Sequence, residues 1–66
     1  MYVLAKDVGK CSYITPGKHY KLKERRRMGT NSIFGGNITD DSGDRIFIRL
    51  KSSAHIGYND WELVND

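Results

Sequence analysis

The chain contains 66 residues (7.6 kDa), which is enough for one small domain spanning residues 1–66 and excludes a second domain. One cysteine excludes an internal disulfide, and the one proline, the seven glycines and the Trp, Tyr and Phe content are typical of a compact all-β domain. The net charge of +3 is unevenly spread: residues 1–27 carry eight Lys or Arg against Asp7 and Glu24, whereas residues 28–66 carry three against six acids.

The N-terminal part is predicted to contain two short strands joined by a long connection. Residues 2–5 (YVLA) form the first strand, and residues 6–17 form the connection, which includes two glycines. Residues 19–24 (HYKLKE) alternate between apolar and polar side chains, so they predict the second strand. Tyr20 and Leu22 should face the core. The side chains expected to face solvent are those of His19, Lys21 and Lys23.

The clearest predicted element is a hairpin, which follows a loop at residues 25–31. Its strands are residues 32–39 and 45–50, and they flank an Asp-rich turn at residues 40–44 that contains Gly43. One register then places the even-numbered apolar side chains on one face. The pairs expected on that face are Ile38 with Ile46, Gly36 with Ile48, and Phe34 with Leu50. The other face should carry Arg45, Phe47, Arg49 and Lys51.

The remaining elements are a helical turn within residues 52–57 and a closing strand at residues 60–64, with Trp61 and Leu63 expected to face inward. This order of elements predicts an all-β fold, a small five-stranded SH3-like barrel with a single helical turn before the last strand. A closed barrel leaves no exposed sheet edge and forms one core from one sheet. An OB-type barrel is the rival architecture, but it normally needs a longer chain and a helix between strands.

Three short motifs support this fold by resemblance. Residues 15–22 (TPGKHYKL), 38–44 (ITDDSGD) and 61–64 (WELV) resemble a Gly-Lys-x-Tyr strand, an Asp-Asp-x-Gly hairpin and a terminal aromatic strand. These features occur in small SH3-like proteins of bacteriophages and bacteria, most of which have no assigned role. The resemblance covers about residues 15–64 and implies a phage-type accessory protein with this fold.

The predicted meander of three strands places many cations on one surface, with a single aromatic ring among them. Lys and Arg side chains along a sheet can neutralise phosphates, and an exposed ring can stack on an unpaired base. We therefore expect a small binding module without enzymatic activity that contacts nucleic acid through this face. The candidate residues are Lys21, Lys23, Arg25, Arg26, Arg27, Arg45, Phe47, Arg49 and Lys51.

A protein-interaction module is the alternative interpretation. Aromatic side chains in the long first loop and near the helical turn form a peptide groove in signalling barrels, and Tyr13 and Tyr58 occupy those positions here. Such a module would dock on a host or viral protein through this groove or through the basic face. The oligomeric state is left open.

The residues that could bind a metal do not form a recognisable motif, so no metal or other cofactor is expected. Cys11, His19 and His55 are too scattered for a zinc site, which needs four closely paired ligands. The acids of residues 40–44 lack the twelve-residue spacing and the closing Glu of a calcium loop.

The first residues (MYVLAKD) lack the apolar run of a signal peptide, and no apolar segment approaches the roughly 20 residues that cross a bilayer. Together with the unpaired Cys11, these features predict a cytoplasmic protein without membrane association. For a viral protein, the compartment would be the host cytoplasm.

Overall fold

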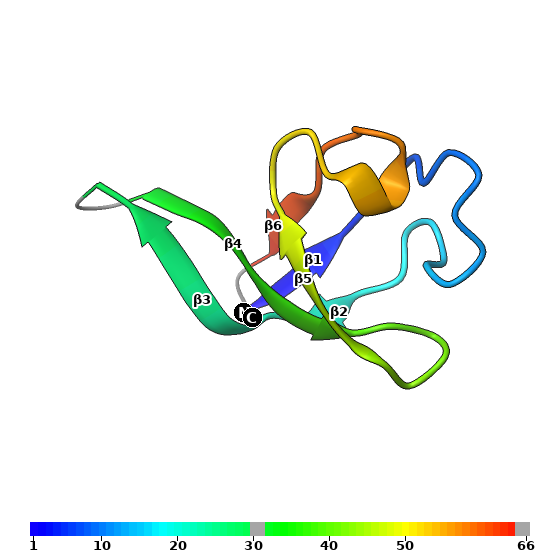
Figure 1. Cartoon of the computed structure of the whole chain (residues 1–66), viewed down its shortest axis with the longest axis horizontal. Helices are drawn as coiled ribbons and strands as arrows, with labels where there is room; N and C mark the ends of the chain where they lie inside the picture. Colours follow the sequence, from blue (N-terminus) through cyan, green and yellow to red (C-terminus); the bar gives the residue numbers. More distant parts are fainter. Residues whose placement is uncertain (30–31, 65–66) are drawn as a thin grey trace.

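Six short strands form two antiparallel three-stranded sheets in the computed structural model, which describes residues 1–29 and 32–64 (Figure 1). The first sheet has the order β2-β1-β6, and the second has the order β3-β4-β5. The strands are β1 (Tyr2–Leu4), β2 (Tyr20–Lys21), β3 (Lys23–Met28), β4 (Ser32–Thr39), β5 (Arg45–Arg49) and β6 (Glu62–Val64). The prediction of an all-β domain is confirmed, whereas the prediction of one closed sheet of five strands is wrong.

The strand count differs because the segment predicted as one strand, residues 19–24, breaks at Leu22. β2 ends at Lys21 and pairs with β1, while β3 begins at Lys23 and pairs with β4. Leu22 is buried between them, and its backbone N–H donates to the carbonyl oxygen of Met1 at 3.0 Å. One continuous segment therefore passes from the first sheet to the second.

A glycine in β4 makes room for this crossing. A Cβ atom on Gly36 would lie 2.8 Å from Leu22 Cδ1 and 2.9 Å from the carbonyl oxygen of Lys23, which is too close for any real side chain. Tyr20 and Leu22 are both buried, as predicted from the alternation of residues 19–24. The position of Leu22 beneath Gly36 therefore joins the two sheets around one core.

The predicted loop at residues 25–31 is wrong over most of its described part, because β3 continues to Met28. Arg26 pairs with Gly35 and Arg27 pairs with Ile33 in the ladder with β4, so hydrogen bonding to β4 orders a segment whose charge suggested a loop. Residues 30–31 of that prediction lie outside the described residues.

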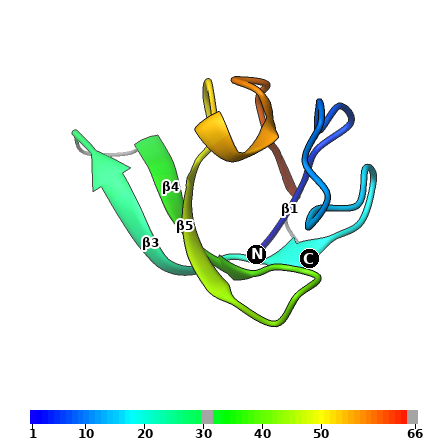
Figure 2. The same ribbon diagram turned by 45° about the vertical axis from the view of Figure 1, so that its right-hand side comes forward.

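β5 ends at Arg49, which also pairs with Gly35, so β3 and β4 continue beyond it as a two-stranded ribbon. This β3–β4 ribbon extends away from the rest of the molecule (Figures 1 and 2). With the ribbon included, the molecule measures 34 × 21 × 19 Å.

The predicted hairpin register is confirmed by the pairing of β4 with β5. Ile38 pairs with Ile46 and Gly36 with Ile48, and the backbone N–H of Leu50 donates to the carbonyl oxygen of Phe34 at 2.7 Å. Two backbone hydrogen bonds close the turn: the N–H of Asp40 donates to the Asp44 carbonyl oxygen, and the N–H of Gly43 donates to the Asp40 carbonyl oxygen. Gly43 has a φ of 86°, which favours glycine. The carboxylate of the buried Asp40 accepts the N–H groups of Ser42 and Asp44 at 2.9 Å. Asx-type chemistry in this turn therefore fixes the register.

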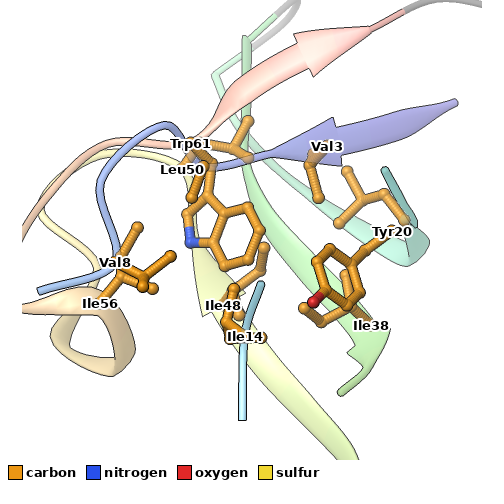
Figure 3. Packing of buried hydrophobic residues seen from close by; sticks show 11 residues of the cluster. Val3, Val8, Ile14, Tyr20, Ile38, Ile48, Leu50, Ile56 and Trp61 are labelled. Carbon is orange, nitrogen blue, oxygen red and sulfur yellow. The ribbon is translucent and has the colours of Figure 1, made fainter. Parts of the chain in front are cut away.

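Side chains from both sheets and from the loops fill a single core (Figure 3). Tyr20 and Trp61 meet edge to face with ring centroids 6.0 Å apart, a favourable aromatic geometry. Trp61 is buried as predicted, but Leu63 is 43% exposed, so the prediction that Leu63 faces inward is wrong. The reason is that β6 is an edge strand, so a neighbouring strand covers Leu63 on one side only. The buried apolar residues are Val3, Ala5, Val8, Ile14, Tyr20, Leu22, Ile38, Ile48, Leu50, Ile56 and Trp61.

The predicted single helical turn is the 3-10 helix η1 (Ala54–Ile56), which lies within residues 52–57. Ile56 is completely buried, and the turn ends at Gly57 with a φ of 67°. Within the described ranges, no helix combines the length and the apolar character that crossing a bilayer requires.

Asp41 connects the long first loop to the β4–β5 turn through hydrogen bonds and an ion pair. Its carboxylate accepts hydrogen bonds from Thr15 Oγ1 at 2.6 Å and from the Tyr20 hydroxyl at 2.9 Å, and it pairs with Lys18 Nζ at 2.7 Å. The backbone N–H of Asp41 also donates to the carbonyl oxygen of Tyr13 at 2.9 Å. The hydrogen bond from Lys18, followed by the one from Thr15, lowers the pKa of Asp41 to about 2.

We expect Gly36→Val to destabilise the fold by about 1–3 kcal/mol, because the added side chain overpacks the site occupied by Leu22 and the Lys23 carbonyl. Urea denaturation measures this change. Thr39→Ala, at an exposed position of the same strand, is the control and should change stability by less than about 0.5 kcal/mol. A Gly36→Val variant as stable as the wild type would contradict the described packing of Leu22.

Stability should also depend on pH through Asp41. Because the folded-state pKa lies near 2, below the ordinary 3.8, ionised Asp41 stabilises the fold above pH 4, and this contribution is lost as pH falls toward 2. Asp41→Asn should lower stability at neutral pH and reduce the loss between pH 4 and pH 2, as measured by urea denaturation across that range. Asp44→Asn removes the same charge from the same turn and should retain the wild-type pH dependence. Equal pH profiles for wild type and Asp41→Asn would overturn the role of Asp41.

Candidate functional site

The outer face of the β3-β4-β5 sheet carries the alternating polar side chains that the hairpin pattern predicts. Ile38 and Ile48 point into the core, whereas Arg45 and Arg49 are exposed and Phe47 is 40% exposed. Successive side chains of a strand point to opposite faces, so the buried Ile48 and the half-buried Ile46 leave the odd positions of β5 in water. The predicted exposure of Phe47 among cations is therefore confirmed.

The strand register aligns these residues in rows across the sheet. Lys23 and Phe47 both pair with Asn37, and Arg26 and Arg49 both pair with Gly35. A Cβ atom on Gly35 would overlap the carbonyl oxygen of Ile48, so the backbones of β4 and β5 approach closely at this point. Because strands lie about 4.8 Å apart, the backbones of Arg26 and Arg49 are separated by roughly 10 Å. The backbones of Arg26 and Arg49 therefore flank the same glycine.

The β3–β4 ribbon concentrates positive charge after Glu24, which is the last acid before the turn at residues 40–44. Arg25, Arg26 and Arg27 are all exposed, and no Asp or Glu occurs between positions 25 and 39. Among the residues that the structure describes, none of these three arginines forms an ion pair. Arg25 donates a weak hydrogen bond to Met1 Sδ at 3.7 Å. Arginines along this edge strand also discourage pairing with another strand, which is a common role of charge at sheet edges.

Glu24 also belongs to this face, next to Lys23 in the sequence. A bulge between Lys23 and Arg26 and a φ of 51° at Glu24 change the direction of the side chain. Its carboxylate lies 3.2 Å from Arg45 Nη1 and accepts a hydrogen bond from Asn37 Nδ2 at 2.9 Å. Glu24 therefore partly neutralises Arg45, although an exposed pair of this kind contributes little to stability.

Two of the predicted cations lie away from this arrangement. Lys21 is exposed on β2, which belongs to the other sheet, because Leu22 separates β2 from β3. Lys51 follows β5, and its Nζ lies 3.5 Å from Asp60 Oδ2. The structure thus places five of the predicted residues on the outer face of one sheet and two at its borders, with two further arginines on the edge strand. The five are Lys23, Arg26, Arg45, Phe47 and Arg49.

A hollow of about 440 Å³ lies beside this face, where the β3–β4 ribbon leaves β5. It is lined by Ser32, Ile33, Phe34, Arg49 and Lys51. The sequence predicts Phe34 on the core face opposite Leu50, but its ring is only half-buried and lies 6.0 Å from that of Phe47 at 60°. The hydrophobic pattern did not reveal this hollow, because the pattern cannot show where β5 ends and stops covering β4.

The two tyrosines of the predicted peptide groove have different surroundings. The Tyr13 hydroxyl lies 2.8 Å from His55 Nδ1, and the two rings meet edge to face at 5.9 Å. Burial, followed by the nearby Cys11, raises the pKa of Tyr13. Tyr58 is 72% exposed and has a φ of 65°. Tyr13 is therefore held by its contact with His55, whereas Tyr58 is exposed to solvent.

The possible metal ligands are also separated. His19 lies beside the ring of Tyr2 at 6.4 Å, whereas Cys11 is a half-buried free thiol. Within the described part of the chain, no three His, Cys, Asp or Glu side chains are grouped to hold an ion.

Comparison with known protein families, with curated proteins and with solved structures finds no match for this chain.

Proposed function

We propose that the protein is a binding module without enzymatic activity that contacts nucleic acid through the outer face of the β3-β4-β5 sheet. The residues of this basic face are Lys23, Arg25, Arg26, Arg27, Arg45, Phe47 and Arg49, with Lys21 and Lys51 at its borders. Binding would occur mainly through phosphate contacts, which do not depend on the base sequence.

The observation that carries this proposal is the β3–β4 ribbon with its exposed arginines. Arg26 and Arg49 flank Gly35, and the stretch from Arg25 to Thr39 contains no acid that would repel a phosphate. Guanidinium groups bind phosphate oxygens through two parallel hydrogen bonds. A two-stranded ribbon is also narrow enough to enter the major groove of a duplex.

We further propose that the fold is SH3-like and that the protein is a phage-type accessory protein acting in the cytoplasm, or in the host cytoplasm if it is viral. The order of a long first loop, a central meander, a tight turn and a 3-10 turn before the last strand supports the fold. The motifs at residues 15–22, 38–44 and 61–64 support the origin.

A protein partner is the second candidate function, and the exposure of Tyr58 favours it. A ring that is 72% exposed at a strained backbone position is an unusual surface feature. Tyr13 contacts His55 in η1, three residues before Tyr58, so this alternative would use the side of the molecule that carries Tyr13 and Tyr58, or the basic face itself.

Binding of mixed-sequence single-stranded and duplex oligonucleotides, measured by fluorescence anisotropy, tests the proposal. The wild type should bind at low salt, and the logarithm of the association constant should fall linearly with the logarithm of the salt concentration. Arg26→Ala should weaken binding to every sequence and reduce the salt slope by about 1.

Lys10→Ala is the matched control for Arg26→Ala. It removes one exposed positive charge from the first loop, which lies at the other end of the molecule from the β3–β4 ribbon (Figure 1). Its affinity should stay within about twofold of the wild type. No binding at low salt would reject the proposal, and a partner whose binding is lost in Tyr58→Ala but insensitive to salt would favour the protein alternative.

Glu24→Gln should strengthen binding to nucleic acid about two- to fivefold. The substitution removes the charge that partly neutralises Arg45 and can retain the hydrogen bond from Asn37. This range corresponds to an exposed charge interaction of up to about 1 kcal/mol. Glu62→Gln is the control, because Glu62 lies on β6, in the other sheet, where its Oε2 is 3.6 Å from Lys6 Nζ. Equal gains in both variants would indicate an effect of net charge alone, and the special position of Glu24 would be wrong.

A further inference from the structure

The hollow beside β5 combines an aromatic wall with two positive charges. Phe34 and Ile33 provide the apolar surface, and Arg49 and Lys51 line the same space. A volume of about 440 Å³ lies at the lower end of the roughly 300–1,000 Å³ that is typical of small-ligand pockets. The hollow therefore suits one planar apolar group that carries a negative charge.

The charge at the hollow distinguishes between possible occupants. Arg49 forms no ion pair with another residue of the ranges 1–29 and 32–64, whereas Lys51 has an exposed pair with Asp60. Arg26 pairs with Gly35 from β3, and Arg49 pairs with the same glycine from β5. A purely apolar side chain would leave these cations unmatched, but a nucleotide offers a ring for Phe34 and a phosphate for Arg49.

The geometry of the two phenylalanines adds a second constraint. The rings of Phe34 and Phe47 lie 6.0 Å apart and are inclined by 60°. Bases in a duplex are parallel and have their faces covered by their neighbours, so two successive paired bases cannot stack on both rings. Two unpaired bases of a single strand can tilt independently and can each meet one ring.

We propose that the hollow at Phe34 is a binding site for an unpaired base of a single-stranded nucleic acid. Phe34 stacks on that base, Arg49 binds the adjacent phosphate, and Phe47 receives the neighbouring base. This inference rests on the proposed function and narrows it from phosphate contact in general to single strands.

The first test uses the wild-type protein with three ligands of equal phosphate number: oligothymidylate, the same strand with abasic sites, and a duplex. At one moderate salt concentration, oligothymidylate should bind about tenfold more tightly than the abasic strand. It should also bind more tightly than the duplex, although the duplex has the higher charge density. Oligouridylate in a parallel measurement distinguishes RNA from DNA as the preferred source of the base.

The second test locates the base. Phe34→Leu should reduce the affinity for oligothymidylate about tenfold and leave the affinity for the abasic strand within about twofold of the wild type. Phe34→Tyr keeps an aromatic ring and should retain binding. Because Phe34 is half-buried, urea denaturation of each variant verifies folding. If Phe34→Leu fails to fold, Phe47→Leu at the exposed neighbouring ring should still show a loss that is specific to bases.

The outcomes separate this inference from the proposed function. Equal affinity for oligothymidylate and the abasic strand, with binding that still falls with salt, would overturn the base site and leave the phosphate contacts in place. Loss of binding in Phe34→Leu that is equal for both strands would likewise overturn the base site. No binding to any of the three ligands at low salt would overturn both.

Discussion

The packing of Leu22 beneath Gly36 is the constraint on which the rest of the structure depends. A single segment leaves the β2-β1-β6 sheet at Lys21 and enters the β3-β4-β5 sheet at Lys23, and the side chain between them lies inside the core. Any side chain on Gly36 would occupy the same space. The two sheets therefore share one core, although among residues 1–29 and 32–64 no strand pairing connects them.

The passage of the chain between the two sheets at Leu22 also determines which side chains are exposed on the β3-β4-β5 sheet. Because the chain restarts as a strand at Lys23, the bulge that follows turns Glu24 outward and sends the three arginines along the edge of β4. β5 ends before β4 does, so the β3–β4 ribbon extends beyond the body and leaves the hollow at Phe34 open. On the other side of the molecule, Asp41 holds the first loop against the β4–β5 turn. The acids in that turn thus have structural roles, while the cations of β3 and β5 remain exposed.

Local chemistry explains which features could be predicted from the sequence. The turn at residues 40–44 fixes its own register through Asp40 and Gly43, and strict alternation fixes the faces of β5. The break at Leu22, the strand character of residues 25–28 and the outward direction of Glu24 all arise from contacts with β4, which alternation cannot reveal. The cations of the candidate site were therefore identified from the sequence, but the hollow and the acid beside Arg45 were not. Leu63 shows the same limit, because only the strand order reveals that β6 is an edge strand, on which Leu63 is 43% exposed.

The buried Trp61 gives the protein an intrinsic optical reporter. The indole is the only one in the chain, it is 4% exposed, and it meets the phenol ring of Tyr20, whose hydroxyl donates to Asp41. Since Trp61 precedes β6, Tyr20 lies in β2 and Asp41 in the β4–β5 turn, separation of either sheet from the core exposes the indole to water. A single fluorescence emission band, shifting to longer wavelength on exposure, therefore follows the cooperative loss of both sheets without any attached dye.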